Sequence, residues 1–138
     1  MKGMARVNYK NLIQAAIDTK ENAYVPYSGF RVGAALLAKD GRIFTGCNVE
    51  NAAYSPTICA ERTAVAKAVS EGCREFTAIA VTGDHGDYLT PCGVCRQVLA
   101  EFCDLNEFQV ILANNVTDYK ELTLAELLPG SFGKENLG

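Results

Sequence analysis

The sequence contains no long apolar run, and this lack sets a first limit on the kind of protein. Its longest apolar stretch, Val32 to Ala38, is far too short to span a bilayer. The beginning of the chain, Met1 to Arg6, leads into a polar segment, which does not resemble a secretory signal. We therefore expect a cytoplasmic protein with no membrane partner.

Positive charge is also scarce. The 138 residues include 13 lysines and arginines against 16 aspartates and glutamates, and the net charge is -3. The basic residues form no stripe, so the sequence lacks the electrostatic footprint of a nucleic-acid-binding protein. A small-molecule partner fits better, and the length suits a single domain covering residues 1–138.

Histidine is almost absent, because His85 is the only one, whereas there are six cysteines. In a chain of this length without an export signal, metal binding or free thiols are more plausible than three disulfides. Cys92 and Cys95 follow Pro91 at a predicted helix start, and residues three apart lie on one helix face. Two thiols are too few for zinc, which prefers four ligands.

Cys59 is the strongest candidate for a third ligand, because it also stands at a predicted helix start. The partial positive charge of a helix N-terminus favours thiolates. Three cysteines leave one position for water, which is the arrangement of a catalytic zinc site. Glu61, two residues after Cys59, is then expected to move protons beside that water without binding the metal. Arg62 and Arg96 are expected to donate hydrogen bonds to the thiolates and offset their excess negative charge.

The apolar pattern predicts alternating helices and strands in an α/β fold. We expect a helix over residues 8–24 with Asn8 as N-cap, strands at 30–38 and 42–49, a helix from near Cys59 to Ser70, and a strand at 76–81. A helix over 92–102, strands at 108–113 and 119–122, and a short helix at 123–128 with a Thr123–Glu126 capping box follow. This order predicts a mixed sheet with helices on both faces, a three-layer α/β/α domain.

Two motifs together carry a family resemblance. A ligand-x-Glu element followed by Pro-Cys-x-x-Cys is typical of zinc deaminases, and Cys59-Ala60-Glu61 and Pro91 to Cys95 match its halves. Over nearly its whole length the chain resembles the small, homotetrameric-type cytidine deaminases. The other matching runs are 24–28, 30–36, 46–54, 59–64 and 91–97, together with Leu127-Leu128-Pro129 and Phe132 near the end.

The resemblance implies a fold, a reaction and a cofactor. The fold would be the cytidine-deaminase-like three-layer sandwich with a five-stranded mixed sheet. The reaction would be hydrolysis of cytidine and deoxycytidine to uridine and deoxyuridine plus ammonia, in pyrimidine salvage. It would use one zinc ion per chain, with Glu61 passing protons from water to N3 of the base and to the leaving amino group. A homotetramer is also implied.

The resemblance further implies the substrate contacts. Asn48 and Glu50 would bind the ribose hydroxyls from one face of the second strand, and Phe30 would pack on the pyrimidine. The backbone around Ala60 would read the base edge. Two aromatic residues would complete the site of a neighbouring subunit, Tyr54 and Phe132.

Several alternatives stay open on the sequence. Cys92 and Cys95 alone are more often a structural zinc or redox pair, Phe30 alone a core residue, and Glu50 and Arg96 alone surface charges. Blasticidin S deaminases share the Pro-Cys-Gly-x-Cys-Arg-Gln run, although the Asn48–Tyr54 run with Arg62 favours a nucleoside substrate. His85 is expected to be solvent-exposed, and the remaining cysteines are expected to be free core thiols, namely Cys47, Cys73 and Cys103.

Overall fold

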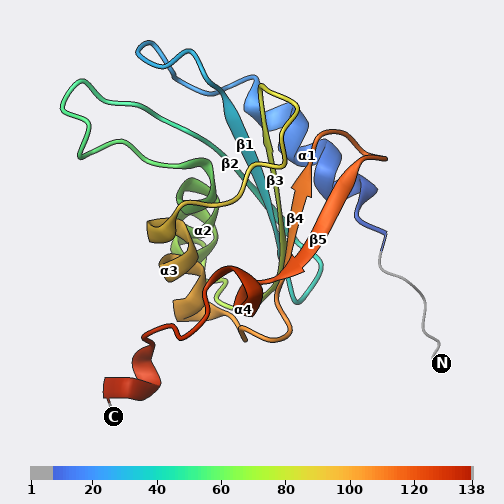
Figure 1. Ribbon diagram of the computed structural model, residues 1–138, viewed down its shortest axis with the longest axis vertical. Helices are drawn as coiled ribbons and strands as arrows, with labels where there is room; N and C mark the ends of the chain where they lie inside the picture. Colours follow the sequence, from blue (N-terminus) through green and yellow to red (C-terminus); the bar gives the residue numbers. More distant parts are fainter. Residues whose placement is uncertain (1–7, 138) are drawn as a thin grey trace.

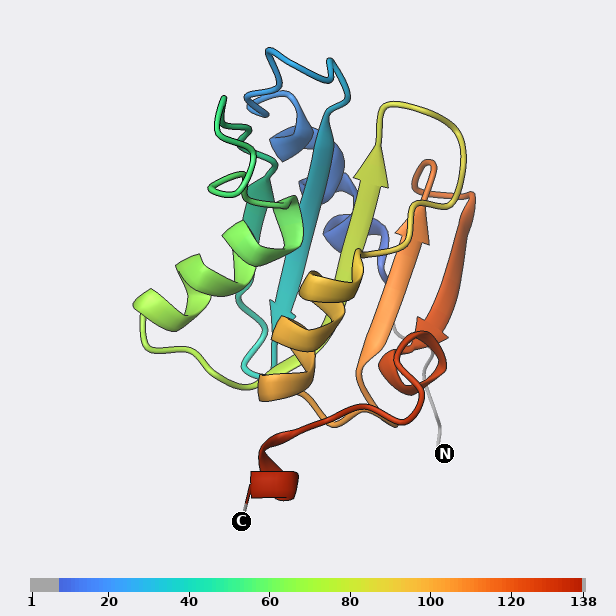
Figure 2. The same cartoon turned by 60° about the vertical axis from the view of Figure 1, so that its left-hand side comes forward.

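The computed structural model describes residues 8–137, which form one five-stranded mixed sheet between two helical layers (Figures 1 and 2). The strand order is β2-β1-β3-β4-β5. Helix α1 covers one face of the sheet, and α2 and α3 cover the other (Figure 2). The strands are β1 (Val32–Ala38), β2 (Ile43–Cys47), β3 (Phe76–Gly83), β4 (Gln109–Ala113) and β5 (Tyr119–Thr123). The helices are α1 (Lys10–Lys20), α2 (Ala60–Ser70), α3 (Gly93–Phe102), α4 (Leu124–Leu127) and the 3₁₀ helix η1 (Lys134–Leu137).

Strand direction follows from the connections. β1 pairs antiparallel with both β2 and β3, and β4 pairs antiparallel with β5. β3 and β4 are parallel, and α3 lies in the crossover between them, as parallel neighbours require. The sequence prediction of a mixed sheet with helices on both faces is therefore confirmed.

The central strand β1 separates two cores by the alternation of its side chains. Ala34 and Leu36 belong to the larger apolar cluster, on the face of α2 and α3. Ala35 between them belongs to the smaller cluster, on the face of α1. Because successive strand residues point to opposite faces, the sequence parity of a β1 residue determines the layer it contacts.

Both helical layers approach the sheet at a glycine. A Cβ on Gly33 would lie 2.0 Å from the Ala16 carbonyl oxygen of α1. A Cβ on Gly46 would lie 2.4 Å from the Ala60 carbonyl oxygen, in the first turn of α2. The absence of a side chain at Gly46 thus sets how closely the beginning of α2 packs on β2.

Two predicted strands are shorter than expected, and one side chain explains both. β1 begins at Val32 rather than at residue 30, and β2 ends at Cys47, so Asn48 and Glu50 follow the strand instead of lying on it. Asn48 Oδ1 accepts from the Val32 N–H at 2.9 Å, and Asn48 Nδ2 donates to the Phe30 carbonyl at 2.9 Å. The amide side chain thereby replaces the backbone pairing that would have extended the ladder.

The first helix is also shorter than predicted. It ends at Lys20, because the N–H groups of Asn22 and Ala23 bond to carbonyls three residues back, in turns tighter than an α-helix. Its N-cap is Tyr9, whereas Asn8 Oδ1 accepts from the Lys10 N–H at 2.9 Å. The capping box of α4 is confirmed, with Thr123 and Glu126 bonding reciprocally.

Within residues 8–137 no helix is both long enough and apolar enough to cross a membrane. The Met1–Arg6 segment considered in the sequence lies outside the described residues.

Candidate metal and catalytic site

Three cysteines from two helix N-termini meet on the α2–α3 face. Cys59 is the N-cap of α2, Cys92 is the N-cap of α3, and Cys95 lies in the first turn of α3. The Cys59 and Cys92 sulfurs are 3.8 Å apart, those of Cys92 and Cys95 are 3.5 Å apart, and all three lie within 4.8 Å of one another. Cys95 is buried whereas Cys92 is exposed, so the cluster opens to solvent on one side.

Cys59 and Cys95 cannot both ionise without a cation between them. The hydrogen bond from Cys95, opposed by burial and helped by Arg62, lowers the pKa of Cys59 to about 5. The same hydrogen bond, together with burial and the nearby Glu61, raises the pKa of Cys95. Ionisation of Cys59 thus disfavours ionisation of Cys95. Three soft sulfur donors that converge on one point are the donor set that zinc fits.

Glu61 lies beside this cluster at the second residue of α2. Its side chain is only 5% exposed, and burial raises its pKa to about 7. The negative charge of Cys59 acts in the same direction, whereas Arg62 opposes it. A carboxyl group with a pKa near neutrality can both accept and donate a proton under ordinary conditions.

The two arginines next to the ligands behave differently. Arg62 Nη2 donates to Cys59 Sγ at 3.7 Å and to the Thr57 carbonyl at 3.1 Å, which places it where the sequence predicted a thiolate contact. Arg96 differs from its prediction, because its Nε donates to the Pro91 carbonyl at 2.7 Å and its Nη1 to the Leu127 carbonyl at 2.7 Å. Arg96 therefore connects α3 to the loop before it and to the end of α4.

The predicted sugar-binding residues already make internal hydrogen bonds. Asn48 bonds to the backbone before β1, as described above. Glu50 Oε1 accepts from the backbone N–H groups of Tyr27 and Ser28, both at 3.1 Å, and Oε2 accepts from the Ser28 hydroxyl. The Ser28 hydroxyl in particular lowers the pKa of Glu50, which keeps the carboxylate ionised. Glu50 lines an open cavity of about 450 Å³ with Ser28 and Tyr54.

The predicted aromatic residues lie at the surface or its edge. Tyr54 is 76% exposed and has a positive φ of 61°, and Phe132 is 57% exposed. Phe30 is half-buried, and Ala60 is fully buried at the first residue of α2.

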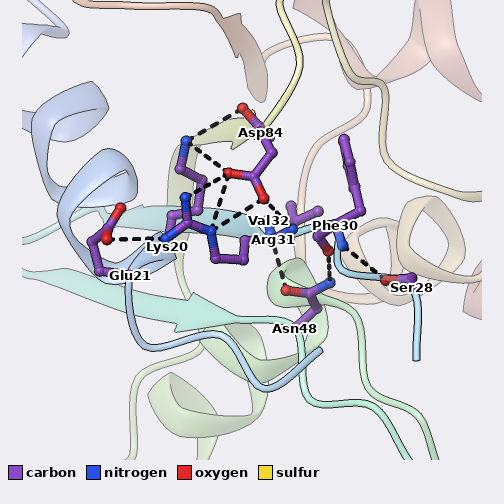
Figure 3. Close-up of polar contacts among 9 residues, drawn as sticks. Lys20, Glu21, Ser28, Phe30, Arg31, Val32, Asn48 and Asp84 are labelled. Carbon is purple, nitrogen blue, oxygen red and sulfur yellow. Dashed lines mark hydrogen bonds and ion pairs between the residues drawn. The ribbon is translucent and has the colours of Figure 1, made fainter. Parts of the chain in front are cut away.

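Sequence reasoning missed an ion cluster behind Phe30. Asp84 follows β3 and lies between Arg31 and Lys20, as Figure 3 shows. Its carboxylate accepts from the Arg31 N–H at 2.7 Å and from Arg31 Nε at 3.1 Å, and Lys20 Nζ is 3.6 Å away. The sequence suggested only an exposed loop here, because the pairing of Arg31 with Asp84 follows from the β1–β3 register of the folded protein.

Comparison with known proteins places this geometry in a family. Residues 6–111 match the model described as the cytidine and deoxycytidylate deaminase zinc-binding region. The chain belongs to the cytidine and deoxycytidylate deaminase zinc-binding family. It is 55% identical over 131 residues to a cytidine deaminase of Sporosarcina psychrophila, covering 95% of this chain and 96% of that one. It is 42% identical to a cytidine deaminase of Mycobacterium tuberculosis, covering 97% and 96%.

Solved structures of the family share the fold. The crystal structure of a cytidine deaminase from Burkholderia pseudomallei matches with a TM-score of 0.86 at 46% identity, covering 91% of this chain and all of that one. A cytidine deaminase from Mycobacterium tuberculosis matches with a TM-score of 0.80 at 42% identity, covering 93% and 99%. The predicted cytidine-deaminase-like fold is therefore confirmed, and zinc is the metal expected of the family region that this chain carries.

Proposed function

We propose that this protein is a zinc-dependent hydrolase that converts cytidine and deoxycytidine to uridine and deoxyuridine and releases ammonia, in pyrimidine salvage. One observation carries the proposal: three converging thiols with a buried carboxyl group of raised pKa beside them. Family membership and relatives named cytidine deaminase support the substrate class.

In this proposal the metal and the acid have separate roles. Cys59, Cys92 and Cys95 hold one zinc ion per chain, and the bound ion supplies a Lewis acid that lowers the pKa of water towards neutrality. Glu61 takes a proton from the attacking water and gives it to N3 of the base. It then carries a second proton from the new hydroxyl group at C4 to the amino group, which leaves as ammonia while the C4 carbonyl forms. Arg62 stabilises the Cys59 thiolate throughout.

The substrate contacts belong to the same proposal. The ionised Glu50 carboxylate accepts hydrogen bonds from the ribose hydroxyls. The Asn48 amide, which has a donor and an acceptor group, also binds these hydroxyls. Phe30 packs on the pyrimidine ring. The Ala60 N–H lies in the first turn of α2, where backbone N–H groups lack intrahelical acceptors, and is available to the base.

We also propose a single domain over residues 1–138 that assembles as a cytoplasmic homotetramer. Tyr54 is 76% exposed and Phe132 is 57% exposed, so both rings are available to enter the active site of a neighbouring subunit. Light scattering after gel filtration should give four times the chain mass of 14.9 kDa, and a monomer would contradict this part of the proposal.

Turnover of the purified protein tests the function. Conversion of cytidine to uridine changes the ultraviolet absorbance, and we expect it to stop when a zinc chelator removes the metal and to return with added zinc. Blasticidin S serves as the competing substrate. Turnover of blasticidin S without turnover of cytidine would reject the proposed substrate, and unchanged activity in metal-free protein would reject the zinc role.

A further inference from the structure

The antiparallel pairing of β1 and β3 continues past the strand ends and brings His85 opposite Phe30. The last paired residues are Val32 and Gly83. The Asp84 N–H then donates to the Arg31 carbonyl at 3.1 Å, which extends the register by one residue. One residue further, the rings of Phe30 and His85 lie with their centroids 5.0 Å apart and inclined by 35°.

Alternation places these two rings on the face of the candidate site. Phe30 has the parity of Val32 and Ala34, which pack against the core beneath α2 and α3. The Phe30 ring also lies over Gly83, where an added Cβ would be 2.8 Å from Phe30 Cζ and 3.1 Å from Leu89 Cδ2. Leu89 stands shortly before Cys92, so the loop that carries His85 leads directly into the metal-binding helix.

Arg31 and Asp84, which adjoin Phe30 and His85 in the sequence, point to the opposite face and hold the two rings in position. Arg31 and Asp84 form their ion pair at 2.9 Å on the α1 side, where Lys20 also approaches Asp84 (Figure 3). The far end of the same loop is fixed by Tyr88, whose hydroxyl donates to Asp118 and whose ring lies 4.5 Å below Lys120 Nζ. His85 is exposed, and the loop that carries it is held in place at both ends by these contacts.

We propose that His85 is a substrate contact whose imidazole extends the Phe30 ring into a two-ring aromatic surface for the pyrimidine nucleoside. The proposal rests on the proposed function, because it assumes that Phe30 packs on the base. The Arg31–Asp84–Lys20 cluster acts on the reverse face as a positioning group. Such a surface binds substrate and transition state alike, so its loss weakens binding without slowing the chemical step.

Steady-state kinetics of three variants test this role. His85→Ala should raise KM for cytidine about three- to tenfold, the size of effect that one aromatic contact gives, with kcat within about twofold of wild type. The inhibition constant of the product uridine should rise in parallel. His85→Phe should restore both values because it keeps a ring, and Asp87→Asn, exposed in the same loop, is the control expected to change neither.

The outcomes separate the two proposals. If wild type turns over cytidine and His85→Ala keeps its KM, or binds more tightly, His85 is no substrate contact and the inference is overturned alone. Equal losses in His85→Ala and His85→Phe would also overturn it, since the ring would not matter. Absence of cytidine turnover in wild type would overturn the proposed function and the inference with it. Zinc content, measured for each variant, should stay constant because the role concerns binding of substrate.

Discussion

At the end of the sheet where β1 begins and β3 ends, the charged groups on one face are paired, whereas those on the other face are largely unpaired. On the α1 face, the two positive charges of Arg31 and Lys20 are matched by the carboxylates of Asp84 and Glu21. On the α2–α3 face, three thiols and Glu61 lie close together, and Arg62 is the cation that contacts them within residues 8–137. The charges on the α1 face are balanced by residues of that face, whereas the α2–α3 face needs a bound cation to balance its thiolates and a substrate to use Glu61. Ionisable groups whose pKa values are shifted by burial and by neighbouring charge, as those of Glu61 and Cys95 are, mark a functional site for this reason.

The sharpest contrast is loss of the metal. Cys92→Ser should lose zinc and all cytidine turnover, because serine is a poor zinc ligand and two thiolates cannot replace three. Cys103→Ser, at the end of the same helix but outside the cluster, should keep its zinc. Metal analysis by atomic emission measures both. Full zinc content in Cys92→Ser would contradict the prediction that the α2–α3 face holds a metal through Cys92.

Substitutions at the two glycines that contact a helix closely allow the packing of the two faces to be compared. Gly46→Ala should displace the first turn of α2, and we expect kcat to fall about 10- to 100-fold because Glu61 moves with it. Gly33→Ala should instead displace α1, costing about 1–3 kcal/mol of unfolding free energy while the folded enzyme keeps its kcat. Urea unfolding and initial rates separate these effects. Equal loss of kcat in both variants would show that the sheet transmits the strain to both layers.

The Asp84 cluster gives a pH-dependent effect. Hydrogen bonds from the Arg31 side chain, then its backbone, lower the pKa of Asp84 to about 2 in the folded protein, below its ordinary value of 3.8. Its ionised form therefore stabilises the fold above about pH 4, and this contribution disappears as the pH falls towards 2. Asp84→Asn should cost about 1–2 kcal/mol at pH 7, and its gap from wild type should close in acid.

Denaturant unfolding from pH 7 to pH 2 measures that gap. Glu21→Gln is the matched control, because its pair with Arg31 is largely exposed and should be worth no more than about 0.5 kcal/mol. A gap that does not change with pH would contradict the assigned role of the Asp84 charge.

The proposed metal ligands and acid could be predicted within each helix start, because local spacing determines which of these residues are neighbours. Cys92 and Cys95 share a helix turn, and Glu61 follows Cys59 on the same helix start, so their relation needs no tertiary information. The layer order was likewise predictable, because each element carries its own periodicity.

The contacts that the sequence did not predict join residues that are distant along the chain. Arg96 bonds to the carbonyl of Leu127, and Asn48 bonds to the backbone on either side of Arg31. Asp84 pairs with Arg31 across strands. A side chain with several hydrogen-bonding atoms has many acceptable partners, and only the folded register selects one. The sequence could therefore predict which residues carry charge or amide groups, but not which backbone groups they would satisfy.

The central claim is that Glu61 moves protons while the three cysteines hold the metal. Glu61→Gln keeps the size of the side chain but cannot carry the proton, so kcat for cytidine should fall about 10²- to 10⁴-fold at unchanged zinc content. Glu101→Gln, exposed on α3, removes the same charge elsewhere and should leave kcat unchanged. A Glu61→Gln protein with one zinc per chain and wild-type turnover would contradict the account, because the buried carboxyl group would then have no part in the chemistry.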